Sequence, residues 1–492
     1  MSARRTIAAG ICAACLWAAA PAAQVPQAPQ PETPPKGIVP KGRAPVSDEV
    51  LELTLPKPAE TSLANGAHLM VLEDRRAPQV SVQIYIPGAG GYFDPAGMVG
   101  LATMTATQMR EGAGQWTTSA LNEELERLAA AVSVSAGASG TEAVLTVSAL
   151  TEHLDRVMDI AAAVLLNPTF PDEEFARYKQ RTRATLMQQR SFPRFLLNET
   201  ANRVMYGEHP ASRVAISLEA LDKATREDLA AFHKARYVPD HAAIAVAGDI
   251  SMADARTLIE TKLAGWTRAN SAVPETMDPE APAAAAVHFV ARPDAVQTNL
   301  AVMAPGIART DKAYDVLSVM NKVIGGGPTG RLFIHLREEK GYTYGAYSNL
   351  DAGLYRGDWT AQTDVRTDVT APALADLLAE IARMRDEPVP ADDFEAAKRS
   401  MIAAFALSLE SPQSIMNYHI TSWRYKLPAD YWDRQPQRIM AVTAPQVQTA
   451  AQAYLDPAKL QIVAVGDAAK IAEILAKHGT VVTYDTEGKV VK

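Results

Sequence analysis

The stretch QVSVQIYIPGAG, residues 79–90, returns as QTNLAVMAPGIA at residues 297–308, so that Pro87 corresponds to Pro305 at an offset of 218 residues. Two further blocks keep this offset to within one residue. They are FPDEEFARYKQRTRATL (170–186) with VPADDFEAAKRSMIAAF (389–405), and HAAIAVAGDI (241–250) with KLQIVAVGDA (459–468). Because chance similarity does not hold its register over most of a chain, the sequence consists of two homologous halves.

Each half is predicted to form the same elements in the same order. In the first half the strands are HLMVLED, VSVQIYI, AVSVSAG, EAVLTVSAL and AAIAVAG, and the longer helices are LDRVMDIAAAVLL, DEEFARYKQRTRATLMQQR and EDLAAFHKARY. Strands at both ends of a unit with helices collected between them predict an α+β fold. We expect two tandem α+β domains, each an antiparallel-rich sheet with helices packed on one side. Their predicted ranges are 48–266 and 286–492, joined by a linker at 267–285.

The composition excludes several classes of protein. The chain has 492 residues, a formal net charge of −8 and 21% charged residues. A general nucleic-acid-binding protein would present a basic face, which this balance disfavours. No stretch of the mature chain is apolar over the roughly 20 residues that a membrane-spanning helix needs.

The N-terminus is predicted to be a secretory signal peptide, residues 1–23. MSARR supplies the positive start, TIAAGICAACLWAAA the apolar run, and a small-residue cleavage site follows near residues 22–23. Both cysteines, Cys12 and Cys15, lie inside this segment, so the mature chain contains no disulfide or thiol site. A Pro-rich linker is predicted at 24–47. We expect a periplasmic protein without a lipid anchor, exported by either the general secretory or the twin-arginine route.

Two copies of one α+β unit after a signal peptide resemble the insulinase/pitrilysin family of zinc metallopeptidases, over nearly all of the mature chain. In the first half, IPGAGGYFDPAGMVGLATMTATQM (86–109) resembles the strand, glycine turn and metal-binding helix of the family. In the second half, IGGGPTGRLFIHLREEKGYTYGAYS (324–348) closely matches the C-terminal signature. The resemblance implies a chain that forms half of a clamshell-shaped peptidase.

Active members of this family carry His-x-x-Glu-His on the helix after Gly-Leu-Ala. Two histidines four residues apart bind Zn²⁺, and the glutamate takes a proton from the metal-bound water. The resemblance places Thr103 and Thr107 at the two histidine positions, Ala106 at the glutamate position, and Ala184 or Thr185 at the position of a third, acidic ligand. A neutral hydroxyl is a poor zinc ligand and a methyl group accepts no proton. We therefore expect no metal and no cofactor in this chain.

The second half retains its signature. RLFIHLREEKG predicts an amphipathic helix that ends at Gly341, and YTYGAYS predicts a strand with Tyr342 and Tyr344 on one face. In the family, an arginine here and a tyrosine seven residues later contact the substrate backbone and the developing oxyanion, and Arg337 and Tyr344 correspond to that pair. A guanidinium and a phenol stabilise negative charge without titrating near neutral pH. Without the resemblance, the helix dipole and strand packing account for the same two residues.

An intact arginine–tyrosine half joined to a degenerate zinc half predicts a non-catalytic, substrate-binding subunit of a heterodimeric zinc peptidase. Its expected partners are a homologous catalytic chain that carries His-x-x-Glu-His and zinc, and peptide substrates. The alternative is a non-proteolytic scaffold or peptide-binding homo-oligomer with the same fold. The sequence leaves open the partner's identity, the peptide size and the cleavage specificity.

Overall fold

The repeated block that opens each half forms the nine-residue strands β3 (Gln79–Pro87) and β10 (Gln297–Pro305). Every second residue of β3 is buried, because successive side chains of a strand point to opposite faces of the sheet. In the computed structural model, which describes residues 50–272 and 274–491, each of these strands has antiparallel neighbours on both sides. The predicted signal peptide (1–23) and the predicted Pro-rich linker (24–47) precede residue 50 and lie outside the described residues.

Two six-stranded sheets follow from the two halves. The first has the order β1 (Ala59–Ser62), β2 (His68–Glu73), β8 (Ala243–Gly248), β3, β7 (Glu142–Leu150), β6 (Ala131–Ala136). The second has the order β11 (Thr343–Leu350), β12 (Asp358–Arg366), β10, β13 (Gln461–Gly466), β9 (Ala286–Ala291), β14 (Val481–Tyr484). The pairs β2–β8, β13–β9 and β14–β9 are parallel and the others antiparallel, which confirms the predicted antiparallel-rich sheets.

The helices repeat with the strands. Those of the first half are α1 (Leu101–Gln108), α2 (Thr118–Arg127), α3 (Leu154–Leu166), α4 (Asp172–Gln189), α5 (Pro193–Tyr206), α6 (Leu218–Lys223), α7 (Arg226–Arg236) and α8 (Met252–Lys262). Those of the second half are α9 (Tyr314–Ile324), α10 (Arg331–Phe333), α11 (Thr370–Asp386), α12 (Ala391–Ser408), α13 (Pro412–Tyr425), α14 (Gln435–Ala441), α15 (Ala444–Tyr454) and α16 (Ala468–Ala476). The predicted α+β fold class is confirmed. Within the described ranges, no helix has both the length and the apolar character needed to cross a bilayer.

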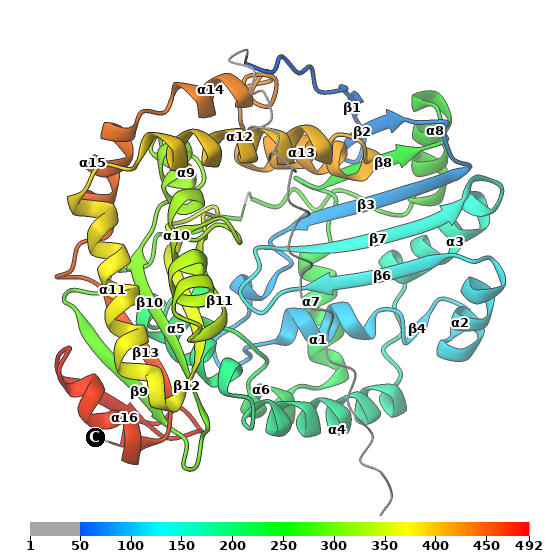
Figure 1. Ribbon diagram of the computed structural model, residues 1–492. Helices are drawn as coiled ribbons and strands as arrows, with labels where there is room; N and C mark the ends of the chain where they lie inside the picture. The colour runs from blue at the N-terminus through cyan, green and yellow to red at the C-terminus, as the bar shows by residue number, and fades with distance from the viewer. Residues whose placement is uncertain (1–49, 273, 492) are drawn as a thin grey trace, which may run out of the picture. The chain divides into compact units, whose positions relative to one another are not determined.

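One helix from each half packs on the sheet of the other half (Figure 1). Helix α5 lies against β13, β10 and β9 of the second sheet, and its counterpart α13 lies against β8 of the first. Each of these helices has 14 residues and begins with a proline at its first position, where the missing N–H costs no hydrogen bond. We call this arrangement the helix exchange.

The helix exchange covers the second face of both sheets. From α5, Leu197 and Met205 are fully buried in one cluster with Val463 and Val465 of β13. On the first sheet, side chains of α13 are buried with Met70 of β2 and alternate residues of β8. Apart from α5 and α13, the helices of each half thus pack on one face of their own sheet, as predicted, and the opposite face is covered from the other half.

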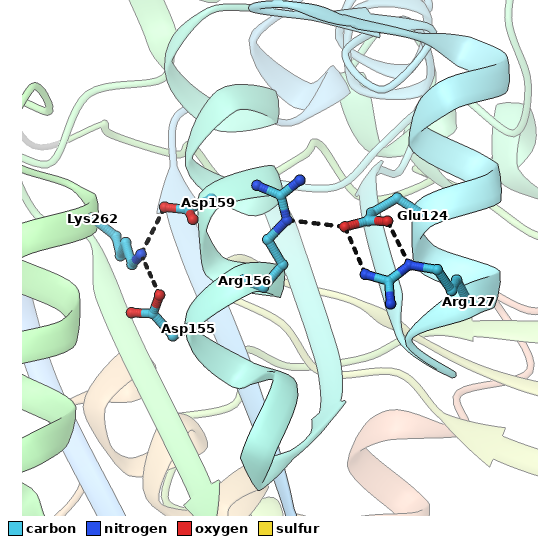
Figure 2. Close-up of polar contacts among 6 residues, drawn as sticks. All are labelled: Glu124, Arg127, Asp155, Arg156, Asp159 and Lys262. Atoms are coloured by element: carbon cyan, nitrogen blue, oxygen red, sulfur yellow. Dashed lines mark hydrogen bonds and ion pairs between the residues drawn. The ribbon is translucent and has the colours of Figure 1, made fainter.

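On the outer side of the first half, ion pairs connect α2, α3 and α8 (Figure 2). Lys262 lies between Asp155 and Asp159, at 2.9 and 2.7 Å, and its side chain is only 13% exposed. Glu124 accepts hydrogen bonds from Arg127 and Arg156, and these lower the pKa of its carboxyl to about 2. These pairs fix the outer helices to one another.

We expect Leu197→Ala to destabilise the whole protein, because Leu197 belongs to α5 but packs on the second sheet. Removing a fully buried leucine side chain from a core costs about 2–5 kcal/mol. Urea denaturation followed by circular dichroism should show one transition at lower urea concentration. The matched control is Leu407→Ala, since Leu407 is 68% exposed and its loss should change the free energy of unfolding by about 0.5 kcal/mol or less. Equal effects of both variants would contradict the importance of the helix exchange.

Candidate functional site

The helix that resembles the metal-binding helix, α1, begins at a backbone position that only glycine suits. Gly100 precedes it with φ +104°, and a Cβ there would lie 2.7 Å from the Cγ1 atom of Ile216. The buried carboxylate of Asp94 accepts hydrogen bonds from the N–H groups of Gly100 and Ala102, at 2.6 and 2.7 Å. Burial raises the pKa of Asp94 to about 6, although both of these hydrogen bonds oppose the shift. Asp94 therefore sets where α1 starts.

The two threonines at the predicted ligand positions donate their hydroxyl hydrogens to main-chain carbonyls. Thr103 Oγ1 donates to the carbonyl of Ala136 at 2.8 Å, at the end of the edge strand β6. Thr107 Oγ1 donates to the carbonyl of Thr103, also at 2.8 Å, in the i to i−4 pattern common for threonine in helices. Between them Ala106 is fully buried and presents only a methyl group.

Tyr178 of helix α4 lies beside the Thr107 end of α1. Tyr178 is 8% exposed, and its hydroxyl lies next to those of Thr107 and Thr182. Burial raises the pKa of Tyr178, and the two threonine hydroxyls partly oppose the rise. Tyr178 was not among the predicted site residues, although its spacing of four residues from Thr182 places both on one face of a helix.

The positions predicted to correspond to the third ligand lie on the exposed side of α4. Ala184 and Thr185 are both exposed, and Thr185 Oγ1 donates to the carbonyl of Arg181 at 3.1 Å. The match of these two positions to the third ligand of active relatives stays a prediction.

The donors around α1 do not suit zinc. Protein zinc sites use cysteine, histidine and carboxylate ligands. Here the predicted ligand and base positions carry two threonine hydroxyls already bonded to carbonyls and one methyl group, and a buried phenol faces them. The other polar groups buried on α1, the Thr105 hydroxyl and the Gln108 amide, are not among these zinc ligands. In residues 50–272 and 274–491, no group of three or more His, Cys, Asp or Glu side chains has an arrangement that could hold a metal ion.

Arg337 lies on a π-helical turn, η4 (Ile334–Glu339), which continues α10. Such turns are rare and occur often at functional sites. The guanidinium of Arg337 lies over the ring of Phe333 at 4.7 Å, and it pairs with Glu338 at 3.5 Å. Its side chain is 43% exposed. The predicted helical segment is present and ends at Glu339, two residues before Gly341, which has φ +65°.

Tyr344 lies on β11, an edge strand of the second sheet, and is 91% exposed. The prediction that Tyr342 and Tyr344 share one face of a strand is wrong. Tyr342 precedes β11 and packs against the second core, and the strand register shifts between Thr343 and Ala346. The physical reason is Gly345, where a Cβ would lie 2.6 Å from the ring of Tyr347. The tyrosine ring folds over this glycine and the strand is irregular there.

Tyr347 connects the regions of Arg337 and Tyr344. Its ring lies 5.5 Å from that of Phe333, the ring beneath Arg337. Tyr344 and Tyr347 both line a cleft of about 690 Å³ between α5 and the strands β11 and β12, which we call the Tyr344 cleft. Arg194 of α5 also lines it and pairs with Asp364 at 3.0 Å. No hydrogen bond, ion pair or ring contact among the described residues connects Arg337 or Tyr344 with α1.

The raised pKa of Asp94 predicts that the free energy of unfolding depends on pH. Its folded pKa of about 6 lies above the value of about 3.9 in an unfolded chain. The folded state therefore holds this proton more tightly, so the contribution of Asp94 to stability is complete below pH 4 and is lost as the pH rises through 6. Between pH 4 and 7, the free energy of unfolding should fall in the wild type relative to Asp94→Asn by on the order of 2 kcal/mol.

Urea titrations at a series of pH values measure this difference. The control is Asp294→Asn, an exposed site with φ +61° that asparagine tolerates. A constant difference between the wild type and Asp94→Asn from pH 4 to 7 would contradict the assignment.

Two family models match the chain. The model described as insulinase, peptidase family M16, matches residues 69–216, and the model described as peptidase M16 inactive domain matches residues 223–401. An uncharacterized zinc protease of Bacillus subtilis, YmxG, is 21% identical over 72% of this chain and 85% of its own length. An uncharacterized zinc protease of Mycobacterium leprae, ML0855, is 25% identical over 54% of this chain and 61% of its own.

Solved structures have the same fold. A peptidase M16 inactive domain from Pseudomonas fluorescens superposes with a TM-score of 0.77 and 26% identity, over 83% of this chain and 98% of that one. A protease from Helicobacter pylori gives a TM-score of 0.77 at 16% identity, over 84% of this chain and all of that one. With both family models matched along one chain, this protein belongs to the insulinase family, peptidase family M16.

Proposed function

We propose that this chain is the non-catalytic, substrate-binding subunit of a two-chain zinc peptidase that degrades peptides. One observation carries the proposal: the hydroxyls of Thr103 and Thr107 are both bonded to main-chain carbonyls, beside the buried methyl group of Ala106. This part of α1 offers no base and no metal ligand. The family membership supports descent from a peptidase.

The second half supplies the groups that contact substrate in this proposal. Arg337 is permanently charged and partly exposed, and the phenol of Tyr344 is almost fully exposed with no hydrogen-bond partner in the described chain. Both groups donate hydrogen bonds to a peptide carbonyl or to the oxyanion that develops from it. Because neither contacts α1 of its own chain, they are free to act on a peptide bound to another chain.

The partner in this proposal is a homologous chain with the complete His-x-x-Glu-His motif, and that chain holds the zinc. An extended peptide adds to a sheet edge of the catalytic chain while Arg337 and Tyr344 contact it from the opposite side. We place the pair in the periplasm, in keeping with the N-terminal sequence of residues 1–23.

A non-proteolytic peptide-binding homo-oligomer is the second candidate, and the Tyr344 cleft favours it. This cleft of about 690 Å³ lies within a single chain and combines an edge strand with polar side chains, features that can hold a peptide without cleaving it. Co-purification distinguishes the two candidates: a zinc-bearing homologue favours the peptidase, and copies of this chain alone favour the homo-oligomer.

We expect Arg337→Ala and Tyr344→Phe each to reduce kcat of the assembled pair by about 10-fold or more, since removal of one oxyanion donor typically costs about 100-fold. Hydrolysis of a quenched fluorescent peptide by equimolar mixtures measures this effect. The controls are Arg434→Ala, a 71% exposed arginine outside the cleft, and Tyr342→Phe, which loses a hydroxyl two residues from Tyr344. Unchanged turnover in Arg337→Ala and Tyr344→Phe would contradict their roles.

A further inference from the structure

A second pocket, of about 390 Å³, lies where the two halves meet, and we call it the interhalf pocket. The first half contributes the ends of β3 and β7 and the loop that contains Phe93. The second half contributes Leu354 and the last residues of α13. This pocket shares no residue with the Tyr344 cleft. It exists because the helix exchange brings the C-terminal end of α13 to the first sheet.

The walls of the interhalf pocket are largely apolar. Tyr85, Phe93 and Trp423 contribute aromatic rings, and Leu354, which is 39% exposed, adds an aliphatic side chain. Burial raises the pKa of Tyr85, so this phenol stays neutral at physiological pH. Aromatic walls of this kind accept one apolar side chain of a ligand.

The charged groups at the pocket give it an excess of positive charge. Arg424 donates hydrogen bonds to Glu142 at 2.7 Å and to Thr141 at 2.9 Å, so the carboxylate of Glu142 is already neutralised. Lys426 is exposed and has no ion pair in the described chain. The indole N–H of Trp423 likewise has no acceptor there. The pocket therefore offers free donors beside an apolar surface and no free carboxylate.

We propose that the interhalf pocket binds the C-terminal end of a peptide whose last side chain is apolar. The terminal carboxylate lies against Lys426, whose charge is unpaired in the described chain, and the last side chain packs among Tyr85, Phe93 and Trp423. A peptide amine or a basic side chain suits the pocket poorly, because Glu142 is occupied by Arg424. That the ligand is a peptide rests on the proposed function. The pocket adds where the C-terminal end of such a peptide is held.

The test compares two versions of one short uncharged peptide that ends in phenylalanine, with a free C-terminal carboxylate or with a C-terminal amide. Isothermal titration with the isolated full chain measures both affinities. We expect the acid to bind about 10-fold more tightly than the amide, with the difference falling as salt is added, because the contributing charges are partly exposed. Equal affinities, or no binding of the acid, would overturn the proposal.

Lys426→Asn is the informative variant, since Lys426 has φ +51° and asparagine tolerates this conformation. It should weaken binding of the acid about 5-fold and leave the amide unchanged. Lys477→Asn is the matched control, because Lys477 is also an exposed lysine at the C-terminal cap of a helix, α16. A Lys426→Asn chain that still distinguishes acid from amide as the wild type does would also overturn the proposal. Hydrolysis with the partner chain tests Arg337 and Tyr344 separately, so failure of this site and failure of the proposed function are distinguishable.

Discussion

Apolar packing of α5 on the second sheet and of α13 on the first is the interaction on which the rest of the structure depends. Each sheet has two faces, and the helices of its own half cover one. The other face contains residues such as Val463 and Met70 and needs a cover supplied from elsewhere in the chain. Because the cover comes from the opposite half, each half buries apolar surface of the other. The exchange also forms both clefts, since α5 borders the Tyr344 cleft and α13 borders the interhalf pocket.

In helix α1, the residues that pack in the core can be considered apart from the residues at the two predicted zinc-ligand positions. Met104 and Ala106 are fully buried, and Asp94 accepts hydrogen bonds from N–H groups at the start of the helix. The helix therefore packs in the core of the first half, and its first turn is fixed. The positions that were predicted to match the two histidines carry hydroxyls that bond to carbonyls of the same chain. The hydroxyls of half-buried Thr103 and exposed Thr107 are thereby satisfied, whereas the buried Thr105 hydroxyl and Gln108 amide of the same helix have no hydrogen-bond partner in the described chain.

Much of the fold could be predicted from the sequence because matching elements of the two halves keep the same spacing although many of their residues differ. The nine residues of β3 and of β10, and the 18 residues of α4 and α12, keep one register between the halves. The alternation of apolar and polar residues along β3 allowed this strand to be predicted, and the structure shows every second residue buried. The helix exchange could not be predicted in this way. An apolar stripe on α5 shows that a helix is covered, but not which of two similar sheets covers it.

The candidate site could be predicted in part. Thr103, Ala106 and Thr107 were predicted to occupy zinc-motif positions because they follow Gly-Leu-Ala, and that match stays a prediction. The structure adds which carbonyls the Thr103 and Thr107 hydroxyls bind. Tyr178 was missed because its role depends on how α4 packs on α1, which is tertiary information. The expected common face of Tyr342 and Tyr344 failed because alternation along a strand assumes a regular ladder, and the register shift near Gly345 breaks it.

We propose that this chain depends on another chain for peptide-bond cleavage. To test this directly, one preparation of the isolated chain is incubated with zinc and the excess zinc is removed. The bound zinc and the rate of peptide hydrolysis are then both measured on that preparation. We expect far less than one zinc per chain and no hydrolysis above background until a homologue with the complete motif is added. One zinc bound per chain, together with hydrolysis by the chain alone, would contradict it.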